Sequence, residues 1–397
     1  MHHFFKIYRE YKYMSYNFAP RFYDGRSTSR EDFHEPLPVS LHTHPRHTDP
    51  EYDARMHKGA HDNLWVITAI SNPVRYKTRY ALYRKFKHHV TQELKLNLIT
   101  VECSFGKRDH QLTSDFDDDN TKLSVLKNGV KTIDVRVKNS SQVWLKENLW
   151  NIGLRSIPLD CEYVLFADAD VQFTHPHFAT ELINSLQEYR VVQPFETACD
   201  LGPDGQVIGV HRSFGYCHAN GWEWRPKPNS EGGYYVEKCK DRQGPSGFGI
   251  PFHPGFAMAF RREVLDKMQL LEVGILGAGD HHMCAALIGK VKLSVPGKIH
   301  TNYKKECLRW EKRASEVVNG SFGYTVGTIL HDFHGAKKNR KYVSRWEIIL
   351  ENEFDPEIDV YRNCYGVLEL EMDKKPKLRD AIMTYFKSRH EDSIEIE

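Results

Sequence analysis

The sequence predicts an α/β fold in which helices flank a mixed, mostly parallel sheet, and three observations support this prediction. Segments typical of strands and of helices alternate between residues 63 and 137, which is the pattern of a parallel sheet. The continuous apolar run at residues 163–166 is typical of a strand that is covered on both faces. The chain has 397 residues, of which 40% are apolar and 27% charged, so it can form a large core.

The expected elements cover most of the chain. Strands are expected at 63–70, 95–103, 131–137 and 163–166, and helices at 75–90, 141–158 and 376–390. Residues 190–254 look less regular, and a glycine-rich turn opens a further helix at about Asp280. The predicted regions are an irregular N-terminal extension at 1–60, a main domain at 61–350, and a C-terminal extension with a strand and a helix at 351–397.

Composition narrows the class of protein. The formal net charge of +2 gives no electrostatic footprint for tight, nonspecific nucleic-acid binding. No segment approaches the ~20 apolar residues that a membrane helix needs, and the opening MHHFFKIYREYK carries charges where a signal peptide needs an apolar run. None of the eight cysteines forms a C-x-x-C pair, which indicates free thiols in a reducing compartment. We therefore expect a soluble, cytoplasmic protein without a membrane span.

Two acids follow the apolar strand directly, in the stretch YVLFADADVQF. Ligands of open parallel sheets bind beyond the carboxyl ends of the strands, and residues i and i+2 of a strand point to the same face. The carboxylates of Asp168 and Asp170 would repel each other there unless a cation lay between them. The strand therefore predicts a metal site. A pair of acids that caps a helix or turns a loop is the alternative.

These residues and their surroundings resemble a known family. The Asp168-Ala169-Asp170 tripeptide after a buried strand is similar to the D-x-D motif of nucleotide-sugar glycosyltransferases with the Rossmann-like GT-A fold, of the family-two type. Further similar motifs follow the order of those enzymes: KENLWNIG at 146–153, HPGFAMAFRREVL at 253–265, GAGD at 277–280, and HDFHG at 331–335 before a basic run. The likeness spans roughly residues 63–350 and points to enzymes of phages and large viruses, with a distant similarity to the base J DNA glucosyltransferases.

The resemblance implies a role for several residues. Asp168, Asp170 and His334 would hold a Mn²⁺ or Mg²⁺ cofactor, and a histidine ligand favours Mn²⁺. His331 lies three residues before His334 and would be its neighbour in a helical turn. Asp280 would act as the general base that takes the proton of the acceptor hydroxyl. Residues expected at the nucleotide sugar are Ser71, Asn72, Arg75, Arg79, Lys146, Asn148, Ala169, Lys338 and Arg340. Residues expected around the sugar and the acceptor are Trp222, Trp224, Gly255, Phe256, Gly279 and His281.

Simpler interpretations stay open for each of these residues. Asp280 could serve only as a cap for the helix that follows it. The two histidines could lie on the surface, and the basic run could be a solvated helix face. Trp222 and Trp224 could pack in the core as well as stack on a sugar or a base.

The sequence therefore predicts a metal-dependent hexosyltransferase that moves a sugar from a UDP-sugar to an acceptor hydroxyl with inversion. The likeness to base J enzymes suggests a hydroxymethylated DNA base as acceptor, and a glycan or a protein stays open. For a viral chain the compartment would be the host cytoplasm.

Two alternatives belong to other classes. Haloacid-dehalogenase-type phosphatases also place D-x-D after an apolar strand, but normally on the first strand, whereas three expected strands precede it here. The second alternative is a non-catalytic protein that binds nucleotide sugars or glycans.

Overall fold

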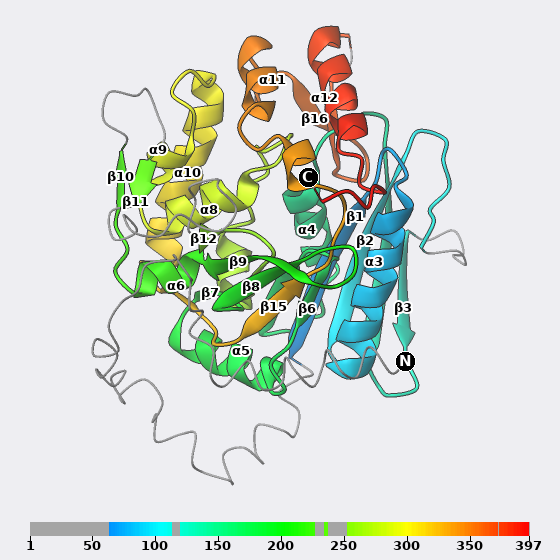
Figure 1. Cartoon of the computed structure of the whole chain (residues 1–397), viewed down its shortest axis with the longest axis vertical. Helices are drawn as coiled ribbons and strands as arrows, with labels where there is room; N and C mark the ends of the chain where they lie inside the picture. Colours follow the sequence, from blue (N-terminus) through cyan, green and yellow to red (C-terminus); the bar gives the residue numbers. More distant parts are fainter. Residues whose placement is uncertain (1–62, 113–119, 227–233, 237–251, 372, 397) are drawn as a thin grey trace, which may run out of the picture. The chain divides into compact units, whose positions relative to one another are not determined.

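An eight-stranded sheet forms the centre of the computed structural model, which describes residues 63–112, 120–226, 234–236, 252–371 and 373–396 (Figure 1). Across this sheet the strands are β14 (Phe322–Tyr324), β7 (Val191–Gln193), β13 (Ala257–Arg261), β5 (Tyr163–Ala167), β1 (Leu64–Ser71), β2 (Asn97–Phe105), β4 (Lys131–Asn139) and β3 (Thr121–Val125). Strands β5, β1, β2 and β4 run parallel, whereas β13 and β3 pair antiparallel with their neighbours. This confirms the predicted mixed, mostly parallel architecture.

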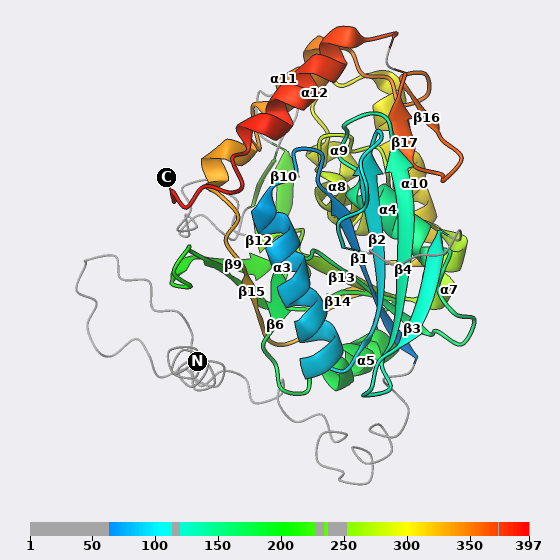
Figure 2. The same cartoon turned by 90° about the vertical axis from the view of Figure 1, so that its right-hand side faces the viewer.

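Helices cover both faces of the parallel strands. Helix α4 (Lys146–Leu154) packs closely on one face, where a side chain at Gly153 would collide with Ile67 and Val101. Helix α3 (Lys77–His88) lies on the other face (Figure 2), where the hydroxyl of Tyr83 is 2.9 Å from that of Thr100. The strands between them are buried on both sides, which explains why they read as continuous apolar runs.

At the end of β5 the chain leaves the main sheet and enters a second, five-stranded sheet. Its strands, in order, are β12 (Phe252–His253), β9 (Val207–Ser213), β8 (Thr197–Leu201), β15 (Thr328–His331) and β6 (Val171–Phe173). Strand β6 follows β5 after only three residues, so the Asp168–Asp170 segment is the crossing point between the two sheets. This crossing places the two acids beside the ends of strands from both sheets.

The remaining elements pack around these sheets. The further helices are α5 (Phe178–Glu188), α6 (Phe214–Ala219), α7 (Arg262–Lys267), α8 (Gly279–Leu287), α9 (Val291–Ser294), α10 (Thr301–Val317), α11 (Arg345–Glu351) and α12 (Pro376–Ser388), with a π-helical turn at His89–Glu93 and a 3-10 turn at Lys337–Arg340. Two short hairpins are formed by β10 (Trp224–Pro226) with β11 (Tyr234–Val236) and by β16 (Val360–Arg362) with β17 (Leu368–Leu370).

The C-terminal residues return to the beginning of the main sheet. After α12, the carboxylate of Asp392 accepts hydrogen bonds from the backbone N–H groups of Lys77 and Thr78, 3.1 and 2.8 Å away. These are unpaired donors in the first turn of α3, which a carboxylate stabilises. The hydroxyl of Tyr76 donates to the carbonyl oxygen of Phe386 over 2.9 Å. The C-terminal tail therefore packs against the N-terminal end of α3.

Several elements differ from the predictions. The expected helix at 141–158 is shorter, because residues 141–145 form no helix and α4 spans only Lys146–Leu154. Residues 190–254 are more regular than expected, since they include β7, β8, β9 and α6. Strand β3 and helices α5 and α10 were not predicted. The predicted N-terminal extension at 1–60 lies outside the described residues, so the domain boundaries stay a prediction. Among the described residues, no helix is both long and apolar enough to cross a membrane.

Candidate active site

The two acids after β5 are held by their backbones. The N–H of Asp168 donates to the carbonyl oxygen of Phe256 over 2.8 Å, and the carbonyl oxygen of Asp170 accepts from the N–H of Asp332 over 2.8 Å. The first bond fixes the chain to the segment before β13, and the second fixes it to the segment after β15. The D-x-D segment is thus clamped between two chain segments that are distant in sequence.

A cluster of metal-ligating side chains forms around Asp170. One ligand atom each from Asp170, His331 and His334 lie within 4.8 Å of one another. Antiparallel pairing of β15 with β6 creates this arrangement, because it places His331 opposite Val171, the residue after Asp170. His334 follows three residues later in a segment without regular structure, not in the helical turn that was expected, and its Nε2 is 3.1 Å from Oδ2 of Asp170. His331 Nε2 is 3.8 Å from Oδ1 of the same carboxylate.

This cluster fits a divalent cation. In the described part of the chain, the buried Oδ1 of Asp170 has no hydrogen-bond partner, which is costly unless a ligand satisfies it. Burial alone would raise the pKa of Asp170, but the two histidines hold that pKa below its ordinary value. One carboxylate oxygen and two imidazole nitrogens suit a transition metal such as Mn²⁺ better than Mg²⁺, which prefers oxygen.

A buried carboxylate lies near the Nδ1 atom of each histidine in the cluster. His331 Nδ1 is 2.8 Å from Oδ1 of Asp200, a residue of β8 that is 2% exposed. Asp200 also pairs with His211 and Lys337. Burial would raise the pKa of Asp200, but its bonds with the two histidines hold it below the ordinary value. Such a carboxylate fixes the orientation of the imidazole, because it accepts the Nδ1 proton and leaves Nε2 free as a ligand.

His334 is held less firmly. Its Nδ1 lies 3.9 Å from Oε1 of Glu391, too far for a hydrogen bond. Its Nε2 is 2.9 Å from Nη2 of Arg340. Burial, followed by the charge of Arg340, lowers the pKa of His334 to about 3. The imidazole is therefore neutral at physiological pH, as metal binding requires.

A second cluster joins Asp168 to Asp280 through Lys146. Lys146 Nζ is 3.1 Å from Oδ2 of Asp280 and 3.4 Å from Oδ1 of Asp168, and the three side chains are 13–26% exposed. Burial would lower the pKa of Lys146, but the two carboxylates raise it above its ordinary value. Burial raises the pKa of Asp168 to about 6. Asp168 thus lies beside Lys146 and outside the group of three ligand atoms around Asp170, so its metal role stays a prediction.

Asp280 occupies the first turn of α8. Its Oδ1 accepts the backbone N–H of His281 over 2.8 Å, as a residue near a helix N-terminus can. Burial would raise its pKa, but Lys146 holds the pKa below the ordinary value, so the carboxylate is ionised and can accept a proton. Gly255 lies directly against it, since a Cβ there would be 2.5 Å from Oδ2 of Asp280. This position is compatible with the general-base role. The N-cap of α8 is Ala278, so Asp280 is not the cap residue that the alternative supposed.

Strained backbone flanks Asp280. Ala278 and Phe256 have φ angles of 75° and 73°, in the left-handed region that non-glycine residues rarely adopt. The ring of Phe256 stacks on His253 with centroids 3.7 Å apart, and its centroid is 4.7 Å from that of His331. Phe256 therefore lies between the region of Asp280 and the metal cluster, and its role at the sugar stays a prediction.

Glu147 is a buried acid that the sequence analysis did not assign. It is 3% exposed, one of its oxygens has no hydrogen-bond partner among the described residues, and burial raises its pKa to about 7. A side chain at Gly279 would lie 2.6 Å from that oxygen, so the glycine predicted for the pocket makes room for Glu147.

The residues expected at the nucleotide are only partly brought together. Ser71 ends β1, and Ala169 lies between the two acids, half-buried. Asn72 binds the backbone of Tyr76 through both ends of its amide. Arg75 has a φ of 65°, and its N–H donates to the carbonyl oxygen of Asn72 over 3.1 Å.

The other residues of this set differ in their surroundings. Arg79 forms an ion pair with Glu391 of the tail. Asn148 is buried and ties α4 to the β16–β17 hairpin, because its Oδ1 accepts from the N–H of Leu368 over 3.1 Å. Lys338 is exposed. Of this set, Lys146 and Arg340 contact the clusters around Asp168 and Asp170.

The two tryptophans belong to packing interactions. Trp224 is buried, and its ring stacks on Phe214 with centroids 4.4 Å apart and lies edge-on to Phe252 at 4.1 Å. Trp222 is half-buried and packs against the same core. His281 is half-buried beside Asp280, and burial lowers its pKa to about 4. The structure does not test the sugar-binding role predicted for these residues.

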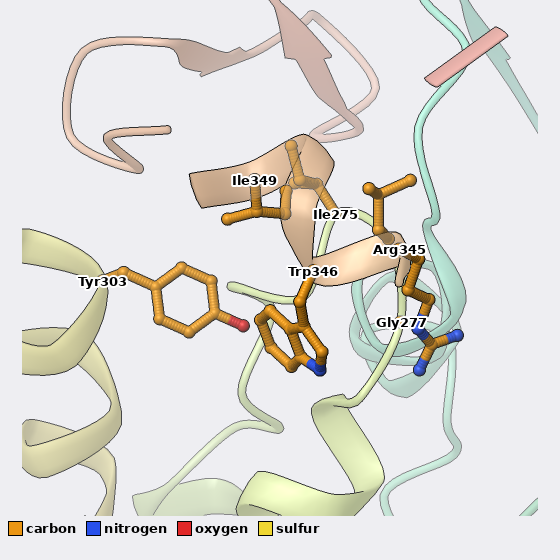
Figure 3. Close-up of a pocket in the computed structure, with 7 residues that line it drawn as sticks. Ile275, Gly277, Tyr303, Arg345, Trp346 and Ile349 are labelled. Atoms are coloured by element: carbon orange, nitrogen blue, oxygen red, sulfur yellow. The ribbon is translucent and has the colours of Figure 1, made fainter. Parts of the chain in front are cut away.

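A small pocket lies beside the turn that leads into α8 (Figure 3). It has about 210 Å³ of empty space and is lined by Ile275, Leu276, Gly277, Tyr303, Arg345, Trp346 and Ile349. Only about 10 Å³ of this space can hold the centre of a water molecule, so the pocket has room for about one water. Figure 3 shows the guanidinium of Arg345 beside Gly277, in the turn that leads to Asp280. None of the residues predicted for the site lines this pocket.

Comparison with known proteins gives structural neighbours only. No protein-family profile matches the chain, and no curated protein matches it. Similar solved structures include S. aureus TarS, with 12% identity and a TM-score of 0.31. The match covers 83% of this chain and 43% of the TarS chain. Another is the catalytic domain of Drosophila β1,4-galactosyltransferase 7 in complex with xylobiose (9% identity, TM-score 0.30, 79% of this chain and 98% of that one).

A third is the mannosyltransferase PcManGT from Pyrobaculum calidifontis in complex with GDP-Man and Mn²⁺ (11% identity, TM-score 0.31, 82% of this chain and 69% of that one).

Proposed function

We propose that the protein is a metal-dependent glycosyltransferase that uses a nucleotide-sugar donor. The observation that carries this proposal is the adjacency of two clusters at one D-x-D segment. Asp170 belongs to a cluster with two histidines that suits a divalent cation, and Asp168 belongs to a cluster with Lys146 and the potential base Asp280. Transfer of a sugar from a nucleoside diphosphate needs positive charge that stabilises the departing diphosphate, and it needs a group that accepts a proton.

The roles follow from the charges of these residues. A divalent cation held by Asp170, His331 and His334 would offset the negative charge of the diphosphate as it leaves. Lys146 and Arg340 add positive charge beside that cluster. Asp280 accepts the proton of the acceptor hydroxyl, whose oxygen forms the new bond to the anomeric carbon while the bond from that carbon to the diphosphate oxygen breaks.

The finer assignments are part of this proposal and rest on the sequence resemblance. They comprise a UDP-hexose as donor, inversion at the anomeric carbon, Mn²⁺ as the metal, and a hydroxymethylated DNA base, a glycan or a protein as acceptor. Two imidazole ligands support Mn²⁺ over Mg²⁺. A phosphatase of the haloacid-dehalogenase type is less well supported, because four strands precede β5 among the described residues, and Asp168, which follows β5, contacts a lysine shared with Asp280.

Thermal unfolding with a panel of nucleotide sugars, with and without Mn²⁺, tests the proposal. We expect one donor to raise the melting temperature only when Mn²⁺ is present, and to be hydrolysed slowly to its nucleoside diphosphate. Binding without hydrolysis or transfer would indicate a non-catalytic binding protein. Hydrolysis of a generic aryl phosphate without any donor binding would favour the phosphatase.

A further inference from the structure

One nitrogen atom in the metal cluster has two competing partners. His334 Nε2 lies 2.9 Å from Nη2 of Arg340 and 3.1 Å from Oδ2 of Asp170. A guanidinium can only donate hydrogen bonds, so Nε2 offers its lone pair to Arg340. The same lone pair is what a neutral imidazole uses to bind a metal. His334 therefore cannot serve Arg340 and a divalent cation at the same time.

The guanidinium of Arg340 also has unused donor capacity. Its Nη1 donates to the hydroxyl of Tyr342 over 3.1 Å, whereas its buried Nε has no hydrogen-bond partner among the described residues. The backbone of Arg340 is fixed, because its carbonyl oxygen accepts from the hydroxyl of Tyr385 over 3.0 Å. Any rearrangement at this position is thus a movement of the side chain around a fixed Cα.

The surrounding charges favour such a movement. Arg340 lies at the end of the 3-10 turn Lys337–Arg340, close enough to Asp170 and Arg389 for their charges to act on it. A divalent cation bound by Asp170 would repel the guanidinium, while the phosphates of a bound nucleotide would attract it. Arginine binds phosphate oxygens well, because its planar fork presents several donors at once.

We propose that Arg340 competes with the metal ion for His334 and, once displaced, binds the diphosphate of the donor. This inference rests on the proposed function and adds a coupling between its two ligands. Metal alone binds weakly, because it must break the contact between Arg340 and His334. Metal together with a nucleoside diphosphate binds more tightly, because the displaced guanidinium gains a new partner. The coupling is reciprocal, as any linkage between two binding equilibria must be.

Mn²⁺ affinity, measured by electron paramagnetic resonance of the free ion, tests this competition. The proteins compared are the wild type, Arg340→Gln, and the control Lys312→Gln, which removes one positive charge from a side chain on α10 that is 78% exposed. Without nucleotide, we expect Arg340→Gln to bind Mn²⁺ about tenfold more tightly than the wild type, the order expected when a charge-assisted hydrogen bond no longer opposes binding. The control should stay within about twofold, because its charge is screened by solvent.

Addition of UDP should narrow this difference. UDP should increase Mn²⁺ affinity in the wild type several-fold more than in Arg340→Gln, because only the wild type has the guanidinium that passes to the diphosphate. Equal or weaker Mn²⁺ binding by Arg340→Gln, or an equal change in both glutamine variants, overturns the competition while leaving the proposed function standing. Failure of the wild type and of every variant to bind Mn²⁺ would overturn both the metal site and this inference.

A structural readout covers the case in which Arg340→Gln does not fold. Crystals of the wild type grown with Mn²⁺, and with Mn²⁺ and UDP, should show the guanidinium away from Nε2 of His334 in the first and on the diphosphate in the second. A guanidinium that remains 2.9 Å from Nε2 while Mn²⁺ is bound to Asp170 would overturn the inference.

Discussion

Replacement of Lys146 by methionine should weaken both the fold and the site. The ammonium of Lys146 lies between the carboxylates of Asp168 and Asp280 and is 13% exposed. Methionine keeps the length and much of the apolar volume of the side chain but removes the charge. The variant therefore leaves two neighbouring carboxylates without their shared cation, and the buried Glu147 adds a third acid close by.

The distances set the size of the effect. At 3.1 and 3.4 Å, and with an effective dielectric constant of about 20, each ion pair has a Coulomb energy of roughly 5 kcal/mol. Desolvation of the ammonium opposes this, and removal of one partner of a buried pair typically costs about 3–5 kcal/mol. Because the two carboxylates are about a quarter exposed, we expect a loss of about 2–4 kcal/mol in the free energy of unfolding at pH 8.

The loss should depend on pH. Without Lys146, the folded-state pKa of Asp168 rises further above that of the unfolded chain, and the pKa of Asp280 loses the charge that holds it below its ordinary value, so that burial raises it. A carboxyl group whose pKa is raised on folding destabilises the protein as the pH rises through that folded pKa. The difference between variant and wild type should therefore be larger at pH 8 than at pH 5.

Urea unfolding followed by circular dichroism measures the effect. The control is Lys312→Met on α10, which removes a lysine that is 78% exposed and 4.0 Å from Glu316, and should cost less than about 0.5 kcal/mol. The double variant Lys146→Met with Asp280→Asn should recover part of the loss, because one unpaired charge is gone. If Lys146→Met unfolds with the same free energy as the control at both pH values, the pairing described for this cluster is wrong.

Three further variants test individual side chains. Asp280→Asn should spare donor binding, measured by calorimetry, yet lower kcat by about 100-fold or more, as loss of a general base does; full activity would remove Asp280 as the base. Asp200→Asn should weaken Mn²⁺ binding by about 10- to 100-fold, because the imidazole of His331 loses the carboxylate that orients it; unchanged affinity would refute that orientation. Glu147→Gln should raise the free energy of unfolding by about 1 kcal/mol above pH 7 and by nothing below pH 5, because burial raises the pKa of Glu147 to about 7 and its charged form is the costly one; an equal effect at both pH values would contradict this.

The sequence predicted the parts of the fold that have strong local patterns. Strands β1, β2 and β5 are largely apolar and buried because both of their faces are covered, whereas β4 alternates apolar and polar residues. Strands β8 and β9 were missed because polar residues interrupt them. Asp200 and His211 lie in these two strands and face the metal cluster, so the side chains that weaken the strand pattern are the ones that support the site.

The candidate site could be predicted only where its residues lie in recognisable motifs. Asp168 and Asp170 follow a buried strand, and Asp280 follows a glycine-rich turn, so each had a local signal. Glu391 had none, because it approaches His334 from the C-terminal tail, 57 positions away in sequence and only 3.9 Å away in space. Arg79 was expected at the nucleotide but pairs with that same tail residue. Contacts of this kind depend on the tertiary packing of the C-terminal tail, and local sequence patterns do not encode such packing.

The most direct test of the central claim is donor binding by the wild type and by Asp170→Asn, measured by calorimetry with and without Mn²⁺. We predict that Mn²⁺ greatly strengthens the binding of one nucleotide sugar to the wild type, and that Asp170→Asn folds normally but shows neither this increase nor turnover. Donor binding that is indifferent to Mn²⁺ in the wild type, or equally strengthened by Mn²⁺ in Asp170→Asn, would contradict the account.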